Sequence, residues 1–239
     1  MDSKNTLSNV DNPGGVIVPL CAETMIGTIP EAKSSLIGVS VRYVPQSNFQ
    51  WFALRASYGR EDKALDFFLG QGVYGYIPKK NVYKRTDKGR KVAIESLIPN
   101  LLFVYSYKEQ IKLFVEKTPE LSYVSYYYDH LQSYREYNPS THRFYDKNPE
   151  LTIPRLEMEN FILATCSHNE HLLQVSESQC HYKSGDVVRV IDGEFKGVEG
   201  RVARVAGQQR VIVSLSGIGL IATAYIPKAF LMKTDDKSY

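Results

Sequence analysis

Hydrophobic and polar positions repeat with clear periods over residues 51–165, and they predict a domain that mixes strands and helices. Residues 51–56 alternate as a half-buried strand does, whereas residues 60–69 carry apolar side chains at helical spacing up to Gly70. The same criteria predict further strands over 73–77, 98–105 and 121–128, and helices over 107–117 and from 154 onward. This order is typical of an α+β domain with helices on one side of an antiparallel sheet.

The pattern changes to strands alone after residue 187. Short apolar runs bounded by glycine and proline follow one another at 187–191, 198–205, 211–215 and 220–226. This spacing predicts a small all-β barrel of about 50 residues. The expected division is a flexible N-terminal extension (1–48, with a short ordered piece at 36–44), an α+β domain (49–167) containing a polar loop (130–152), a linker (168–182), the barrel (183–233) and a tail (234–239).

Composition places the chain among ordinary soluble proteins. Of its 239 residues 43% are hydrophobic and 23% charged, and the net charge of +3 is too small to indicate a nucleic-acid partner by itself. The longest apolar stretch, 217–226, is shorter than the roughly 20 residues that a membrane helix needs. Three cysteines are too few for a disulfide framework and fit a reducing compartment. We therefore expect a cytoplasmic protein with no membrane partner.

No catalytic motif stands out in the chain. Nucleophile elbow, phosphate-binding loop, metalloprotease and dinucleotide fingerprints are all missing from the sequence, so we expect no enzyme and no cofactor. One group has the side-chain types that bind zinc: Cys166, His168, His171, Cys180 and His181. The pair Cys166 and His168 is too close for a usual zinc finger, and Cys180 and His181 are adjacent. We therefore expect no metal, and a helix end and linker with incidental thiols.

A basic segment spans residues 79–91 and contains a single acid, Asp87. Its cations are Lys79, Lys80, Lys84, Arg85, Lys88, Arg90 and Lys91. Clustered cations of this kind displace counterions from phosphates, so the segment is a candidate nucleic-acid site. A solvated surface loop is the equally open alternative.

The strand around Phe103 is apolar on both sides. If Leu102 faces the helices, then Leu101, Phe103 and Tyr105 lie on the opposite face, which in such sheets is normally polar. The neighbouring strand 121–128 adds several tyrosines. An uncovered face of this kind would be a protein-docking patch, which the pattern favours. The alternative is that the linker or the barrel covers the face within the same chain. Stacking on single-stranded bases is less favoured, because few cations lie between these aromatic residues.

The order of these motifs resembles the NusG family. Residues 51–56 (WFALRA), the Gly-Arg-Glu at 59–61 and the Tyr-Ile-Pro at 76–78 are similar to the NusG N-terminal (NGN) domain. Residues 98–104 (IPNLLFV) are similar to the docking strand of its specialised RfaH-like branch. Residues 183–200 resemble the KOW module, an SH3-like barrel, with motif positions at Gly193, Phe195, Gly197 and Gly200. The likeness covers about residues 49–233, and its tyrosine-rich first half and the stretch 201–227 most resemble UpxY-type paralogues of Bacteroides-like bacteria.

The resemblance implies a transcription elongation factor whose NGN domain binds the clamp of RNA polymerase. Specialised members prevent pausing and termination, and UpxY proteins do so in capsular polysaccharide operons. By position, Leu101 and Phe103 fall on the strand that docks the polymerase, and Lys84–Lys91 fall in the basic hairpin that lies near DNA. Leu101 replaces a usual aromatic residue and Arg55 stands where the branch has tyrosine. The implied docking surface is therefore shifted toward Tyr105 and Tyr123, with Arg55 at its side.

The hypothesis is a monomeric, specialised antitermination and elongation factor. Its implied partners are RNA polymerase, non-template DNA or leader nucleic acid, and either the ribosome or the termination helicase through the KOW domain. Two alternatives stay open: a general NusG-type elongation factor, and a KOW protein that binds RNA or ribosomes without polymerase contact.

Overall fold

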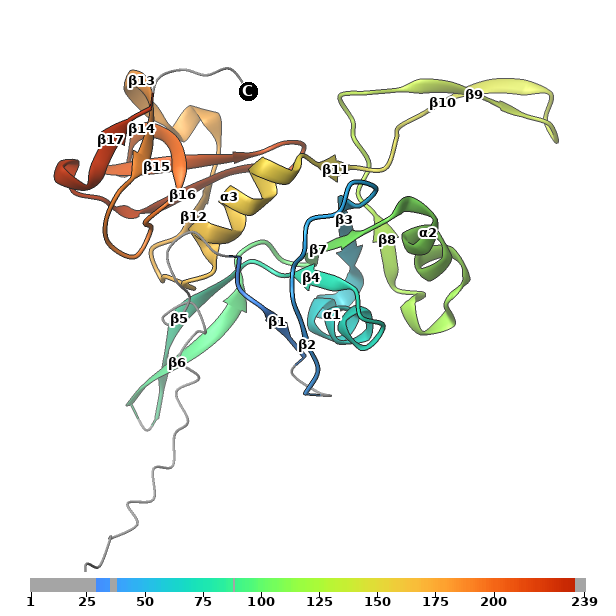
Figure 1. Cartoon of the computed structure of the whole chain (residues 1–239), viewed down its shortest axis with the longest axis horizontal. Helices are drawn as coiled ribbons and strands as arrows, with labels where there is room; N and C mark the ends of the chain where they lie inside the picture. The colour runs from blue at the N-terminus through green and yellow to red at the C-terminus, as the bar shows by residue number, and fades with distance from the viewer. Residues whose placement is uncertain (1–28, 35–37, 88, 235–239) are drawn as a thin grey trace, which may run out of the picture.

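The computed structural model describes residues 29–34, 38–87 and 89–234, with the backbone alone at 183–186. Cys21, Lys88, the tail beyond residue 234 and most of the predicted extension lie outside the described residues. Two sheets form the body, with helix α3 between them, and two hairpins project from it (Figure 1).

The first sheet belongs to the predicted α+β domain and is antiparallel throughout. Its strands are β3 (Gln50–Ala56), β4 (Tyr74–Tyr76), β7 (Leu101–Ser106), β8 (Val124–Tyr126) and β11 (Thr152–Ile153). The order is β11-β3-β7-β4, and β8 also pairs with β3. Every residue of β7 is buried, as expected for a strand that is apolar on both sides.

Helices α1 (Glu61–Gly70) and α2 (Lys108–Lys117) cover one face of this sheet. Phe52 and Leu102 from the strands pack there with Phe68 from α1 and Ile111 from α2. Glu61 and Asp62 occupy the first turn of α1, where the helix dipole favours negative charge.

The opposite face is also covered, which contradicts the prediction of helices on one side only. Helix α3 (Arg155–Thr165) begins directly after Pro154 and lays Met158, Phe161 and Ile162 on that face. The N-terminal segment adds a second cover, which we call the N-terminal strap (residues 29–34 and 38–49). It contains the short pair β1 (Ala32–Lys33) and β2 (Ser40–Val41).

Two segments form antiparallel hairpins: the polar one was predicted to be a loop, whereas the family resemblance implied a hairpin for the basic one. The basic segment forms β5 (Lys79–Thr86) and β6 (Gly89–Ser96), and the polar segment 130–152 contains β9 (Tyr134–Asn138) and β10 (Arg143–Lys147). The loop prediction at 130–152 was wrong because both faces of that hairpin are polar or aromatic and exposed, so no apolar alternation marks it.

The second sheet has six antiparallel strands in the order β12-β16-β15-β14-β13-β17. These are β12 (Leu173–Val175), β13 (His181–Val190), β14 (Glu199–Val205), β15 (Gln208–Leu215), β16 (Gly219–Tyr225) and β17 (Leu231–Lys233). Short 3-10 turns occupy Ser57–Gly59, Pro119–Leu121, Glu177–Gln179 and Lys228–Phe230. Because β12 pairs with β16, the sheet begins inside the predicted linker.

The two sheets share one continuous core through α3. Phe161 of α3, Phe103 of the first sheet and Val213 of the second belong to the same buried cluster. Two reciprocal hydrogen bonds fix the helix to β14: the Asn160 amide donates to the Glu199 carbonyl at 2.7 Å, and the Glu199 N–H donates to Asn160 Oδ1 at 2.8 Å.

Candidate functional site

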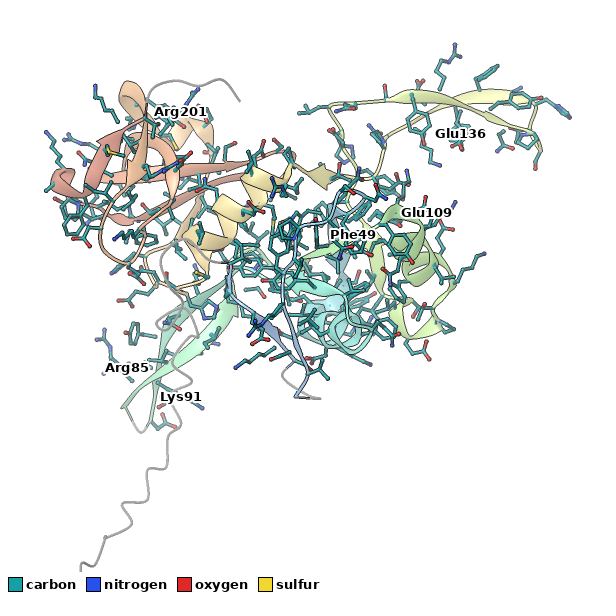
Figure 2. The ribbon with its side chains drawn as sticks, in the orientation of Figure 1. Phe49, Arg85, Lys91, Glu109, Glu136 and Arg201 are labelled. Atoms are coloured by element: carbon teal, nitrogen blue, oxygen red, sulfur yellow. The ribbon has the colours of Figure 1, made fainter. Side chains whose placement is uncertain are left out.

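The basic hairpin β5–β6 projects from the edge of the molecule, with Arg85 and Lys91 near its tip (Figure 2). Its register places like charges directly opposite one another, Lys84 against Lys91 and Arg85 against Arg90. Such cross-strand pairs of like charge destabilise a hairpin. A bound polyanion would offset this repulsion, which makes the tip a candidate site for phosphate groups.

Some of the hairpin cations are already paired and others are not. Lys84 forms an ion pair with Glu95 at 2.6 Å, and Lys79 pairs with Asp62 of α1. Arg85, Arg90 and Lys91 form no ion pair with any described residue, and all three are exposed. Lys80, half-buried near the hairpin base and opposite Glu95 in the register, also forms no ion pair with a described residue. The exposed unpaired charge of the described hairpin residues therefore lies at the tip.

The hairpin also carries an exposed apolar side. Tyr83, Val92 and Ile94 lie on the face that holds Arg85 and Arg90, and each is more than two-fifths exposed. The Arg90 guanidinium lies 5.9 Å from the centre of the Tyr83 ring. Tyr83, Arg85, Gly89 and Arg90 line a shallow cavity of about 410 Å³. This combination suits a ligand that presents both anionic groups and flat apolar surface.

Contacts at its base hold the hairpin to the body. The Asn81 N–H donates to the His168 carbonyl at 2.7 Å, the Leu97 N–H donates to the Pro78 carbonyl at 2.8 Å, and Ser96 Oγ donates to Glu61 at 2.7 Å. Burial, and then the charge of nearby Lys79, lowers the pKa of His168 below its ordinary value. His168 therefore sits neutral at the hairpin base near pH 7.

The predicted docking residues do not form an open patch, and this expectation is corrected. Leu101 and Phe103 are fully buried and Tyr105 is 4% exposed. The Phe103 ring meets Phe161 of α3 edge to face, with ring centres 5.7 Å apart. The alternative, that the same chain covers this face, is correct, but the cover is α3 and the N-terminal strap instead of the linker or the barrel.

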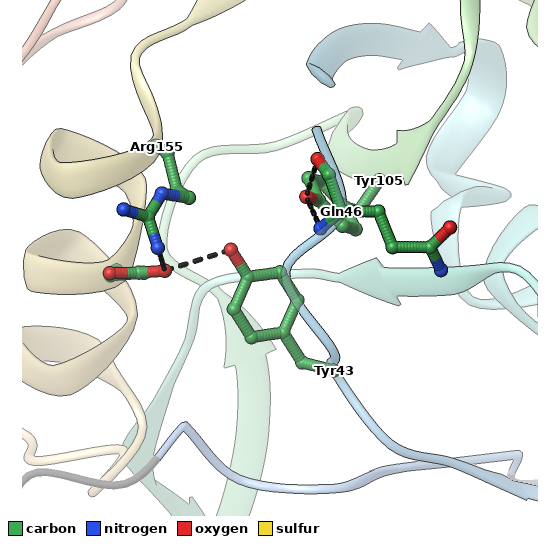
Figure 3. A network of polar contacts seen from close by, with 5 residues as sticks. Tyr43, Gln46, Tyr105 and Arg155 are labelled. Carbon is green, nitrogen blue, oxygen red and sulfur yellow. Dashed lines mark hydrogen bonds and ion pairs between the residues drawn. The ribbon is translucent and has the colours of Figure 1, made fainter. Parts of the chain in front are cut away.

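The N-terminal strap closes the aromatic end of this face (Figure 3). Tyr43 stacks on Trp51 with ring centres 5.4 Å apart, and its hydroxyl donates to Glu159 of α3 at 2.8 Å. The Tyr105 hydroxyl accepts a hydrogen bond from the Gln46 N–H at 2.9 Å and donates one to the Gln46 carbonyl at 3.1 Å. The described part of the extension is thus a packed element.

The two remaining docking candidates lie elsewhere. Tyr123 packs on the other face, with the core below α1 and α2, and the Arg60 guanidinium lies 3.9 Å from its ring centre. Tyr123 is buried, which raises the pKa of its hydroxyl. Arg55 is exposed and pairs across the sheet with Leu101 and Ser125. Of the predicted docking residues, Arg55 alone is exposed.

The predicted KOW positions lie at the turn before β14 and within that strand. Gly193 and Gly197 have positive φ angles of 81° and 93°, and Phe195 between them is buried. A side chain at Gly200 would collide with the backbone of Ile212 on β15. Backbone geometry and packing therefore explain these residue types without any ligand.

The candidate zinc ligands do not converge. Within the ranges that the structure describes, no group of three or more His, Cys, Asp or Glu side chains could hold a metal ion. Among the described helices, none has the length and apolar character that crossing a membrane requires.

Residues 49–129 match the protein-family model described as transcription termination factor nusG. No curated protein matches the chain. The matched residues run from β3 through β8 and include α1, α2 and the basic hairpin, whereas β9–β10, α3 and the second sheet lie outside the match. The family match and the observed α+β domain therefore support a NusG-like assignment, carried by the domain at residues 49–129.

Proposed function

We propose that this protein is a non-enzymatic transcription elongation factor that binds RNA polymerase and suppresses pausing and termination. The observation that carries the proposal is the unpaired positive tip of the β5–β6 hairpin, located inside the residues that match the NusG family. In this reading the tip contacts the phosphates of DNA that passes the polymerase, independently of sequence.

The proposed action is mechanical. A bound factor shifts the balance between elongating and paused polymerase only by the difference in its affinity for the two states. In our proposal, the surface that meets the polymerase includes Arg55 and the neighbouring exposed Ser125, which lie at the open end of the covered sheet face. Leu101 and Phe103 support this surface from within the core.

The finer features of the proposal rest on the sequence resemblance. They are a specialised antitermination role in polysaccharide operons, a monomeric cytoplasmic protein, and a KOW-like second sheet that contacts the ribosome or the termination helicase. A general elongation factor is the rival within the family. An RNA- or ribosome-binding protein without polymerase contact is the rival from another class.

The test is in vitro transcription through a terminator placed downstream of a promoter and leader, with the cognate polymerase. We expect the wild-type protein to increase read-through and Arg85→Gln/Arg90→Gln to remove most of the increase. The matched control is Lys112→Gln/Lys117→Gln, which deletes two exposed charges from α2 of the same domain. In a DNA-binding assay, the double hairpin variant should flatten the dependence of log affinity on log salt by about two.

Polymerase contact is tested separately by co-purification. Arg55→Ala should reduce binding of the purified protein to the polymerase and leave its melting temperature unchanged. If the wild-type protein neither co-purifies with polymerase nor alters read-through, the proposal fails. Binding to ribosomes or RNA in that case would favour the rival from the other class.

A further inference from the structure

The second hairpin, β9–β10, is a separate projection that starts beyond the family match and ends before α3 (Figure 1). We call residues 132–147 the aromatic arm. Glu136 lies on it, far from Arg85 and Lys91 of the basic hairpin (Figure 2). The proposed function assigns the aromatic arm no role.

Hydrogen bonds stabilise the aromatic arm at its base and at its tip. At the base, the Asn148 amide donates to the carbonyls of Asp129 and Gln132, at 2.9 and 2.6 Å. At the tip, Asn138 Oδ1 accepts hydrogen bonds from the N–H groups of Ser140 and Thr141, at 2.9 and 3.3 Å. These contacts hold the arm in one shape before a ligand arrives, which lowers the entropy cost of binding.

One face of the aromatic arm forms a platform of rings beside a cation. Tyr137 and Phe144 are cross-strand partners, with ring centres 5.2 Å apart, and they are 46% and 59% exposed. The Arg135 guanidinium lies 5.5 Å from the centre of the Phe144 ring on the same face. The Tyr137 hydroxyl also hydrogen-bonds His142 Nδ1 at 3.0 Å. The exposed ring surface and the neighbouring guanidinium together suit a flat, anionic ligand.

On the other face of the arm, the carboxylate of Glu136 is neutralised by neighbouring side chains. Glu136 accepts a hydrogen bond from the Tyr145 hydroxyl at 2.6 Å and forms an ion pair with Lys147 at 2.9 Å. Asp146 is the single acid on the platform face; it is exposed, lies opposite Arg135 in the register, and forms no ion pair with a described residue. Arg143 adds a further exposed cation near the tip. Of the two acids on the arm, Glu136 is therefore neutralised by its partners, and Asp146 is the one unpaired carboxylate beside the rings and cations.

The composition of the arm favours a ligand that binds by stacking on aromatic rings. Residues 132–147 contain four aromatic side chains but no alanine, valine, isoleucine, leucine or methionine. Tyrosine, phenylalanine and arginine are also enriched in protein interfaces, so a protein partner is the alternative that the binding test must exclude. Stacking on bases needs π-faces and nearby cations alone. We propose that the aromatic arm binds single-stranded nucleic acid, stacking bases on Tyr137 and Phe144 while Arg135 contacts the backbone.

The test measures binding of the full chain to fluorescent oligonucleotides of about 15 nucleotides by anisotropy. Single-stranded DNA, RNA of the same sequence and the corresponding duplex are compared, in the absence of polymerase. Tyr137→Ala/Phe144→Ala should weaken binding to single strands by roughly tenfold or more. Binding to the duplex should be unchanged, because paired bases are not available to stack. The DNA and RNA arms identify which single strand the protein prefers.

Two controls separate the platform from general effects. Tyr225→Ala removes a similarly exposed tyrosine, 57% exposed, from the second sheet and should leave all affinities unchanged. Arg85→Gln/Arg90→Gln tests the basic hairpin and should weaken binding to single strands and duplex alike. Each variant is checked for an unchanged melting temperature.

The proposal is overturned if the ring variant binds single strands within about twofold of the wild type, or if single strands and duplex lose affinity equally. Because no polymerase is present, this outcome is independent of the transcription assay. A factor that acts on polymerase could lack a stacking arm, and a stacking arm could exist on a protein that never binds polymerase.

Discussion

Phe103→Ala tests whether the sheet face that carries Phe103 is covered, as in the structure, or open, as the sequence pattern favoured. Phe103 is fully buried and its ring packs edge to face against Phe161 of α3. Truncating a fully buried phenylalanine costs about 3–5 kcal/mol, and the ring pair contributes part of that loss. For a chain of this length, about 4 kcal/mol lowers the melting temperature by roughly 10 °C.

The assay is thermal unfolding followed by circular dichroism, with Phe144→Ala as the matched control. Phe144 is 59% exposed on the aromatic arm, so the same truncation there should change stability by less than about 0.5 kcal/mol. If Phe103→Ala melts with the wild type while losing polymerase binding, the face is open in solution and the covering role of α3 is refuted. If the variant melts early, loss of polymerase binding by it says nothing about docking.

Two further predictions concern the strap and the hairpin base. Tyr43→Phe removes the hydroxyl that donates to Glu159 and should cost about 1 kcal/mol in urea unfolding, less than a lone charged hydrogen bond because Arg155 still pairs with Glu159; an unchanged midpoint would contradict the strap contact. His168→Asn suits the positive φ of 54° at this position. Because the pKa of His168 is lowered in the folded state, the unfolded chain takes up the proton first, so wild-type stability should fall as pH drops below about 6.5. The variant should lose less stability over that range. If the melting temperatures of wild type and variant fall equally as the pH is lowered, His168 is not the group responsible.

The basic hairpin shows how much a charge pattern can predict. The cations of residues 79–91 are visible in the sequence, and they lead directly to a phosphate-binding hypothesis. Their pairing is not visible there. Only the register places Arg85 opposite Arg90, and only the fold gives Lys79 and Lys84 their carboxylate partners. The structure therefore reduces the seven candidate cations to the three exposed, unpaired ones at the hairpin tip, Arg85, Arg90 and Lys91.

Tyr123 shows why a face assignment by alternation fails at the end of a strand. The prediction extended the strand over 121–128, which would place Tyr123 and Tyr127 on one side. In the structure β8 begins at Val124 and Tyr123 belongs to the preceding turn, so the period of two does not reach it. Tyr127 packs against the α3 side, whereas Tyr123 packs on the opposite side.

Local elements with a strong hydrophobic period could be predicted from the sequence. Helices α1, α2 and α3, the apolar strand β7 and the strand-only second half follow from apolar spacing and from proline and glycine at their ends. Such signals depend on neighbours within a few residues. The aromatic arm has no apolar period, so sequence reasoning missed it, although four aromatic residues without any aliphatic residue were a signal to notice.

Which surfaces are exposed could be learned only from the folded chain. The face that carries Phe103 has the composition of a docking patch, yet it is closed by α3 and the N-terminal strap, which lie on either side of β7 along the chain. Burial of apolar area drives such packing, and this force is non-directional, so the strand sequence does not specify whether a segment of the same chain or a partner will cover it. That choice depends on the complete three-dimensional arrangement.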